Sequence, residues 1–419
     1  MTRNISSALS ICAFLLLFCA TCCDHAAAQV TLLILDETEP QILTGSGGTI
    51  VLPGEDVNVV ATLNGTDLTV PGDLDFELQK LDAGALTGFL VLDQSRVTVS
   101  PSTLMPQIRF HNEDIGDIVG FRTFHESSVL HEGNTEVSNI GNGSAFFALA
   151  FDNSEITLDG VSSVSQSGNG RAHGILSAGS ATVHVTGQMT VIDEGNNSAE
   201  LAAAAEDSHI TIDGFGELIE TGPGLVRALS ASENARIDYR GDFTMTQEGP
   251  GDAVLLSGFG NSHITVAGDL VITSTGPDLN VIPINLEDNA RLDILSGRLA
   301  IFGGDFFVGQ TIGVSDSSEV YWSGGMIDFG NRDPFFGVND TARLVIDGYG
   351  FNRPLGVVDD EAGRIEGTLS DGSPFAIDFG RTEGAIILLV PEPSAICACS
   401  IAMLMLVRQR FYRTVASTL

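Results

Sequence analysis

The residues Asp207–Gly214 read DSHITIDG, and Asn261–Gly268 read NSHITVAG, so nearly the same eight residues return further along the chain. Their final glycines are separated by twice 27 positions, and glycine recurs at this period in two columns. The first column is Gly133, Gly160, Gly187, Gly214, Gly241 and Gly268; the second is Gly141, Gly168, Gly195, Gly222, Gly249 and Gly276. A fixed period of this size is the signature of a stacked repeat.

The residues between the glycines indicate strands. Apolar residues stand two and four positions before each glycine of the first column, as in Ile210 and Ile212 or Ile264 and Val266. Alternation of this kind is typical of a strand with one buried face. A second apolar column follows the first glycine: Val164, Val191, Leu218, Met245 and Ile272. A third short apolar run follows the second glycine, so three strands and three turns fill each repeat.

Coils of this kind predict an all-β fold, a right-handed parallel β-helix in which each strand pairs with its counterpart one coil on, about 4.8 Å away. A leucine-rich repeat has a similar period but needs a leucine pattern that is missing here, and a propeller blade is longer. Ile210, Ile237 and Ile264 should therefore lie above one another in the core. We also expect the glycine columns to mark tight turns with positive φ.

The predicted organisation has four parts. Residues 1–28 form a signal peptide, 29–94 an N-terminal cap with the first irregular coils, 95–380 the β-helix, and 381–419 a C-terminal tail. The coils are most regular over 126–288, and the residues 363–379 are expected to form strands around an Asp-Gly turn that closes the C-terminal end. Four residues share one turn position, where their side chains should bind turn amides: Asn153, Asp207, Asn234 and Asn261.

The charge of the chain excludes some partners. It has 54 acidic and 19 basic residues, a formal net charge of −35, and a single lysine, Lys80. Such a chain is repelled by phosphate backbones and anionic lipids, so nucleic acid is not expected as a partner. The sequence predicts no cofactor and no metal site, and it leaves Ca²⁺ binding by the acidic faces open.

Candidate chemistry must come from the outward residues of the strands. His209 and His263 stand two coils apart, about 9.6 Å, which is too far for one shared metal ion. Asp213 and Arg240 are on adjacent coils and are expected to pair. Asp159 and Asp213 have the spacing of a hydrolase carboxylate pair, but stacked coils produce such pairs easily. The most economical interpretation is a solvated polar face, with no catalytic residue assigned.

The resemblance of the predicted coils to β-helix polysaccharide lyases and hydrolases implies carbohydrate chemistry as one function. A lyase of that kind needs a basic residue beside an acidic calcium site, and no lysine lies in the regular coils. Phosphate-loop, HExxH and GxSxG motifs are also missing from the sequence. Because fold analogy alone would carry the enzyme assignment, it stays the second hypothesis.

The N-terminal residues indicate export. Arg3 precedes the apolar run of residues 11–20, and Ala26 and Ala28 supply the small residues of a signal-peptidase site, so cleavage is expected before Gln29. Four cysteines lie in this segment and two, Cys397 and Cys399, in the tail. The exported body should therefore contain no disulfide and no thiolate metal site.

The C-terminal tail has three parts in order. Pro391, Glu392 and Pro393 form a Pro-Glu-Pro turn, residues 395–407 are mostly apolar, and a basic stretch follows with Arg408, Arg410 and Arg413. The apolar segment is short for a membrane span, and the arginines mark its cytoplasmic end.

This tail resembles the PEP-CTERM sorting signal of exported bacterial proteins. The resemblance covers the tail alone and implies an exosortase-type enzyme that recognises the motif in the inner membrane and removes the segment after it. It also implies a destination in the cell envelope, at the outer surface or in the extracellular matrix. The first function hypothesis is therefore an exported, non-enzymatic surface or matrix protein associated with exopolysaccharide, and the second is a carbohydrate-active enzyme.

Overall fold

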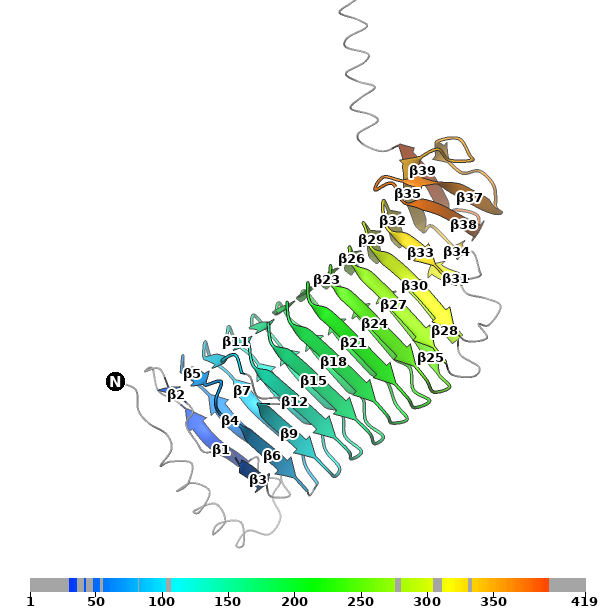
Figure 1. Cartoon of the computed structure of the whole chain (residues 1–419). Helices are drawn as coiled ribbons and strands as arrows, with labels where there is room; N and C mark the ends of the chain where they lie inside the picture. Colours follow the sequence, from blue (N-terminus) through cyan, green and yellow to red (C-terminus); the bar gives the residue numbers. More distant parts are fainter. Residues whose placement is uncertain are drawn as a thin grey trace, which may run out of the picture.

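The computed structural model describes residues 30–391, except 36–40, 43–47, 53–55, 82, 103–106, 276–279, 304–310 and 331–333. The described chain winds into a parallel β-solenoid in which every coil but the last contributes three strands (Figure 1). One coil, for example, consists of β16 (Ala172–Ser177), β17 (Thr182–Val185) and β18 (Gln188–Asp193). The predicted parallel β-helix is therefore confirmed.

Each strand belongs to one of three faces, which we number in chain order. The first face contains β1 (Val30–Leu35), β4 (Val57–Thr62), β7 (Leu86–Val91), β10 (Ile118–Thr123), β13 (Ala145–Ala150), β16, β19 (Ala199–Ala204), β22 (Val226–Ala231), β25 (Asp252–Gly258), β28 (Asn280–Leu286), β31 (Thr311–Val314) and β34 (Phe335–Val338). The second face contains β2 (Gln41–Ile42), β5 (Asp67–Val70), β8 (Arg96–Val99), β11 (Ser128–His131), β14 (Glu155–Leu158), β17, β20 (His209–Ile212), β23 (Arg236–Tyr239), β26 (His263–Val266), β29 (Arg291–Ile294), β32 (Glu319–Trp322) and β35 (Arg343–Tyr349).

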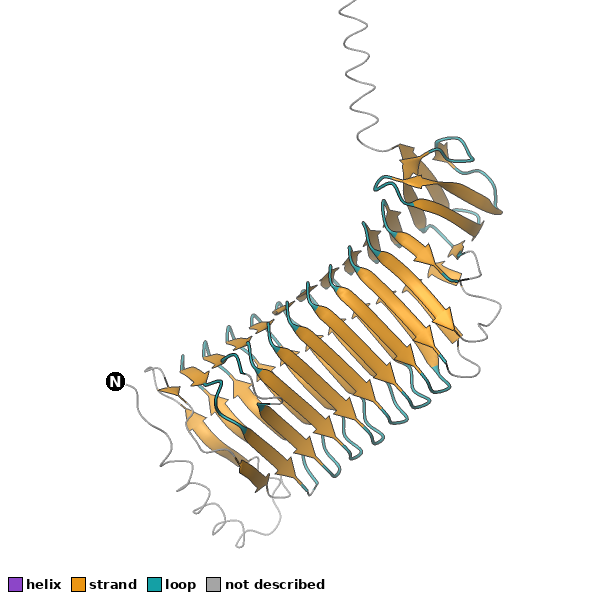
Figure 2. Ribbon diagram, in the orientation of Figure 1, coloured by secondary structure: helices purple, strands orange, loops and turns teal. Residues whose placement is uncertain are grey.

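The third face is one continuous 11-stranded parallel sheet. It contains β3 (Gly48–Leu52), β6 (Phe76–Lys80), β9 (Ile108–Asn112), β12 (Asn134–Asn139), β15 (Val161–Gln166), β18, β21 (Phe215–Glu220), β24 (Asp242–Gln247), β27 (Asp269–Ser274), β30 (Arg298–Gly303) and β33 (Met326–Asp328). These broad strands run side by side along the rod in Figure 2. The segment predicted as cap and first irregular coils thus already follows the solenoid, with β1 in register with β4.

The core is a set of apolar columns along the axis. Ile210 pairs with Ile237, and Ile237 with Ile264, and all three side chains are fully buried. On the third face the column from Val164 to Ile272 is likewise buried. Because each inward residue is covered by its counterparts above and below, the period-two pattern of a four-residue strand is enough to build a continuous core.

The expectation of positive φ is wrong for the two glycine columns. None of their described members has a positive φ. The residues that do adopt positive φ stand at other positions of the chain. A Cβ at Gly214 would lie 2.0 Å from the carbonyl oxygen of Gly187, and one at Gly168 would lie 1.9 Å from that of Gly141. Glycine is required here because the backbones of stacked coils approach too closely for any side chain.

Left-handed backbone occurs instead at the turn between the first and second faces. Its column of positive φ is Asp152, Gly179, Glu206, Glu233, Gly260, Asp288, Asp316 and Asp340. The next residue forms a ladder: Asn234 donates to Asp207 at 3.0 Å, and Asn261 donates to Asn234 at 3.1 Å. Asn234 and Asn261 therefore bind the counterpart side chain one coil before them and not a turn amide as predicted, because the coil spacing brings these side chains within hydrogen-bonding distance of one another.

The C-terminal end is closed as predicted by a hairpin. Strands β37 (Ala362–Leu369) and β38 (Pro374–Arg381) pair antiparallel around Asp371 and Gly372. Strand β38 continues the first face against β34, and β39 (Ile386–Pro391) continues the second face against β35. The short strand β36 (Gly356–Val357) covers β39 from the other side. These strands cap the apolar columns at this end of the rod.

Candidate functional site

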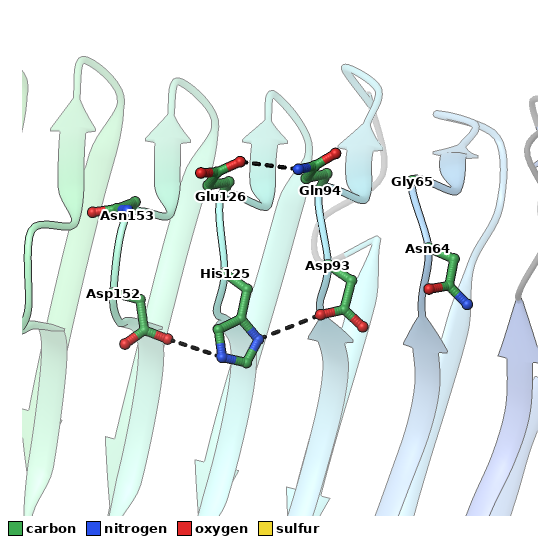
Figure 3. Close-up of a pocket in the computed structure, with 8 residues that line it drawn as sticks. All are labelled: Asn64, Gly65, Asp93, Gln94, His125, Glu126, Asp152 and Asn153. Atoms are coloured by element: carbon green, nitrogen blue, oxygen red, sulfur yellow. Dashed lines mark hydrogen bonds and ion pairs between the residues drawn. The ribbon is translucent and has the colours of Figure 1, made fainter.

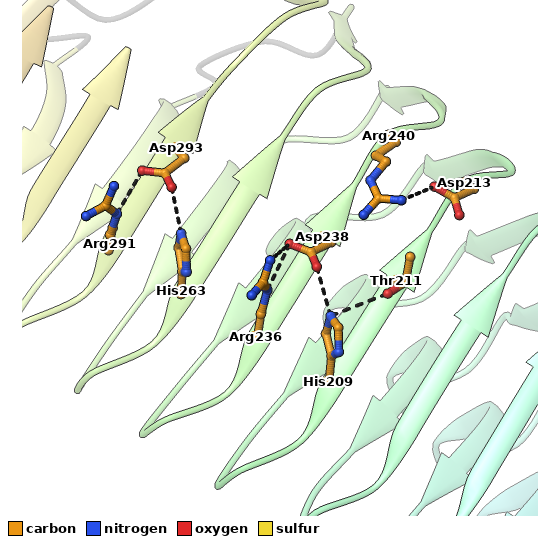
Figure 4. A network of polar contacts seen from close by, with 9 residues as sticks. All are labelled: His209, Thr211, Asp213, Arg236, Asp238, Arg240, His263, Arg291 and Asp293. Atoms are coloured by element: carbon orange, nitrogen blue, oxygen red, sulfur yellow. Dashed lines mark hydrogen bonds and ion pairs between the residues drawn. The ribbon is translucent and has the colours of Figure 1, made fainter. Parts of the chain in front are cut away.

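The densest polar network lies on the outward side of the second face. His209 begins β20, and Arg236 and Asp238 lie on β23, one coil on. Asp238 accepts a hydrogen bond from the Nε2 of His209 at 2.9 Å, and its other oxygen accepts from Nε and Nη2 of Arg236 at 3.0 and 2.9 Å (Figure 4). Asp238 is buried although it faces outward, because these two longer side chains cover it.

The same network recurs two coils further along. His263 of β26 pairs with Asp293 of β29 at 2.9 Å, and Arg291 donates to the other oxygen of Asp293 at 2.8 Å (Figure 4). The near-identity of DSHITIDG and NSHITVAG is therefore also a repeat of a polar cluster. Each histidine has its own carboxylate partner.

Asp213 forms a third cluster at the end of β20. It accepts from Arg240 on the next coil at 3.5 Å, as predicted, and from His184 on the preceding coil at 2.9 Å. Asp159, the carboxylate considered as its catalytic partner, accepts from Thr186 at 2.6 Å. The two carboxylates thus have separate partners.

The electrostatics of the two buried carboxylates follow from these contacts. Burial raises the pKa of Asp238, but hydrogen bonds from Arg236, His209 and Thr265 outweigh it, so the pKa lies below its ordinary value. In Asp293, burial is likewise outweighed by His263 and Arg291, and its pKa is also lowered. Both groups are therefore held as anions that bind cationic or polar neighbours.

The geometry at His209 differs from that of a catalytic relay. In a nucleophile–His–Asp relay, the carboxylate binds one ring nitrogen and the nucleophile lies against the other. Here Asp238 and the hydroxyl of Thr211 both approach Nε2 of His209, at 2.9 and 3.4 Å. The network orders the side chains of the face but does not align a hydroxyl for attack. Among the described residues, no group of three or more His, Cys, Asp or Glu side chains is arranged to hold a metal ion.

A shallow hollow of about 580 Å³ lies further toward the N-terminus. It spans the turn between the first and second faces in four successive coils. It is lined by Asn64, Gly65, Asp93, Gln94, His125, Glu126, Asp152 and Asn153 (Figure 3). His125 lies between two carboxylates, with its ring nitrogens 3.4 Å from Asp93 and 3.4 Å from Asp152. Just before these turn residues, Phe124 and Phe151 stack at 5.0 Å, and Arg122 lies over both rings.

Sequence reasoning found part of these sites. It placed His209 and His263 outward but missed Asp293, because the coil length changes to 28 residues after β26. The signal was the recurrence of Arg-Ile-Asp at 236–238 as Arg-Leu-Asp at 291–293. The hollow around His125 was missed altogether. Its lining residues differ from coil to coil, and only the register of the stacked coils brings them next to one another.

The predicted sorting and cleavage residues fall almost wholly outside the described chain. Pro391 is described and is the last residue of β39, paired with Gly348. Glu392, Pro393, the apolar segment 395–407, Arg408, Arg410, Arg413, Ala26 and Ala28 lie outside the described residues. Within the described ranges, no helix is long and apolar enough to cross a membrane.

Searches of family models, curated proteins and solved structures return no match to this chain.

Proposed function

We propose that this chain is an exported, non-enzymatic rod of the cell envelope or extracellular matrix, sorted through its C-terminal tail and associated with exopolysaccharide. The observation that carries the proposal is the position of Pro391. This residue begins the sorting motif and also ends β39, the last described strand. An exosortase-type enzyme would then act at the end of the rod, and the anchoring in the inner membrane would be transient.

The organisation of the body supports a tail that is removed without loss of the fold. The β37–β38 hairpin and β39 cap the columns upstream of Glu392. The coils are held by stacking against their neighbours, so their stability is a local property of the rod. A body of this kind, with a strongly acidic surface and rigid ladders, suits a structural component that stays soluble outside the cell.

The outward charges also support a structural role. Several cations of the second face are bound by carboxylates of the same or a neighbouring coil, as in Arg236 with Asp238 and Arg291 with Glu319 at 3.2 Å. Such ladders hold the side chains against one another and stabilise the coil-to-coil contact. They give the rod an ordered polar surface that repeating sugar units could contact at several successive coils.

A carbohydrate-active enzyme is the second candidate, and the hollow around His125 favours it. It brings Asp93, Asp152 and Glu126 together beside half-buried phenylalanines, the residue types that bind sugars. Inverting hydrolases leave room for a water between two free carboxylates. Here the ring of His125 lies between Asp93 and Asp152 and contacts both, so the space that a catalytic water needs between the two carboxylates is occupied.

The test is binding and turnover of polysaccharide by the purified exported protein. Glycan-array binding and release of reducing ends should be measured in parallel, with Asp93→Asn/Asp152→Asn as the variant and heat-denatured protein as the blank. The proposal expects binding to neutral or cationic exopolysaccharide and no reducing ends above the blank. Release of reducing ends that disappears in the double variant would establish the enzyme instead.

A further inference from the structure

A column of polar side chains runs through the core of the third face. It is formed by the last residues of successive strands, which point inward and are fully buried: Lys80, Asn112, Asn139, Gln166, Asp193, Glu220, Gln247 and Ser274. Period two continues from the apolar column, because each member follows an apolar core residue by two positions in the regular coils. Polar residues at such core positions need partners, since an unpaired buried polar group is costly.

Several of these side chains bind a glycine-rich turn, either the one that follows in the same coil or that of the preceding coil. Asp193 Oδ1 accepts from the backbone N–H of Gly195 at 2.8 Å, and Glu220 Oε1 accepts from that of Gly222 at 2.8 Å. The amide of Gln166 donates to the carbonyl of Gly141 at 2.8 Å. The column therefore caps the turns of the second glycine column from inside.

In four consecutive members of the column, one side-chain oxygen accepts no hydrogen bond. Gln166 Oε1, Asp193 Oδ2, Glu220 Oε2 and Gln247 Oε1 are buried acceptor oxygens without a hydrogen-bond partner. They belong to successive coils, so adjacent members of the column are separated by about 4.8 Å at the backbone. Four acceptors in a row, two of them carboxylate oxygens, receive no hydrogen bond in the structure, and carboxyl protons or a bound cation would satisfy them.

The charged groups nearby do not supply that cation. Lys80 is in the same column but four coils from Asp193, about 19 Å at the coil spacing. His173 on β16 acts on Asp193 and would favour its ionised form, but it lies 3.5 Å from Glu200, which also lies 3.7 Å from Arg227. Glu194 and Glu220 add only negative charge around Asp193.

We propose that Asp193 and Glu220 form a proton-binding site in the core. The carboxyl protons there donate hydrogen bonds to the unpartnered oxygens of the column and stabilise the stacking of these coils. Two protons suffice: the O–H of Asp193 donates to one neighbouring acceptor of the column, and the O–H of Glu220 donates to another. At intermediate pH a single proton serves the carboxyl pair. Loss of the last proton leaves two adjacent buried anions, so the coils from β18 to β24 become the part of the rod that is sensitive to alkaline pH.

Both pKa shifts agree with this site. Burial raises the pKa of Asp193 to about 6, and burial together with the charge of Asp193 raises the pKa of Glu220 to about 8. A carboxyl group whose pKa is higher in the folded than in the unfolded chain stabilises the fold fully at acid pH. That contribution decreases as the pH rises above the unfolded pKa and is lost once the pH has passed the folded pKa. The sensitive window therefore extends from about pH 4 to above pH 8.

The direct test is infrared spectroscopy of the full chain. Wild type should retain the C=O stretch of a protonated carboxylic acid at pH 7 and lose it at pH 9.5, whereas Glu220→Gln should lack it at pH 7. Absence of that band in wild type at pH 7 would overturn the proposal. Because this readout uses wild type, it holds even where a variant folds poorly.

Thermal unfolding gives the second test. Between pH 6 and pH 9, the melting temperature of Asp193→Asn/Glu220→Gln should fall less than that of wild type, since its amides donate hydrogen bonds and do not titrate. Glu248→Gln removes an exposed carboxylate one residue after the column and should follow wild type. Equal slopes in all three proteins would contradict the site. If Ca²⁺ at pH 9 raises the melting temperature of wild type but not of the double variant, the column binds a cation and the proton assignment is wrong.

Discussion

Ile210 lies directly under Ile237 in the parallel register of β20 and β23, and neither side chain reaches solvent. The same contact recurs along the rod, because every inward side chain of one coil packs against its counterpart in the next coil. The consequences of the arrangement can be measured one column at a time.

Replacement of Ile237 by Asp should unfold the coils around β23. The carboxylate would lie between Ile210 and Ile264 without a partner, at a cost of several kcal/mol. The control is Thr182→Asp, which adds the same charge at an exposed position of the same face. Chemical denaturation should show a large loss for Ile237→Asp and a change below about 0.5 kcal/mol for Thr182→Asp. Equal stability of the two variants would be incompatible with the core.

Glycine at position 214 should be needed for space and not for φ. Gly214→Ala places a Cβ 2.0 Å from the carbonyl oxygen of Gly187 and should cost about 3 kcal/mol as the stacked coils are pushed apart. Gly372→Ala is the matched control, since Gly372 has φ +91° and open space around it. It should cost only the backbone strain, about 1–2 kcal/mol. A larger loss at Gly372 than at Gly214 would refute the close-approach explanation.

The fold could be predicted from the sequence because coil stacking repeats the same requirement every 27 residues. Period two gave the buried face of Ile210 and Ile212, and the glycine columns gave the coil length. The reason for those glycines could not be predicted, because the approach of Gly214 to Gly187 depends on the distance between coils and not on the local turn.

The sites were less predictable for the same reason. The cluster of Asp238 depends on residues from two coils whose pairing is diagonal, so strand alternation alone does not give it. Asp193 and Glu220 stood at the inward position of their strands, and period two would have placed them in the core. The sequence alone did not single them out, because acidic residues are seldom fully buried without a paired cation, and Lys80 of the same column lies four coils from Asp193.

Asp238 and Asp213 should differ in their contribution to stability although each contacts a histidine and an arginine. Asp238→Asn should cost about 2–3 kcal/mol, because it leaves Arg236 and His209 without a buried anion. Asp213→Asn should cost less than about 1 kcal/mol, because its ion pair with Arg240 is exposed to solvent and screened. Denaturant midpoints of the two variants against wild type measure the difference, and a cost at Asp213 equal to that at Asp238 would contradict the role of burial.

The rod should also lose stability at acid pH. The pKa values of Asp238 and Asp293 are lowered in the folded chain, so their contribution is present above the ordinary carboxyl pKa and is lost as the pH falls through the lower, folded value. Stability measured from about pH 5 down to about pH 2 should decline, and less steeply in Asp238→Asn/Asp293→Asn. If the stability of wild type and of the double variant falls equally with pH, these two carboxylates do not cause the loss of stability at acid pH.

The sorting of the protein through its tail is the central claim about function, and intact mass with cell fractionation tests it most directly. In a host that carries an exosortase, wild type should lose the segment after the Pro391–Glu392–Pro393 motif and leave the inner membrane. Glu392→Ala should keep its tail and stay there, with the β-sheet circular dichroism of wild type. Wild type that retains its tail and remains in the inner membrane would contradict the account, and a simple tail anchor would replace it.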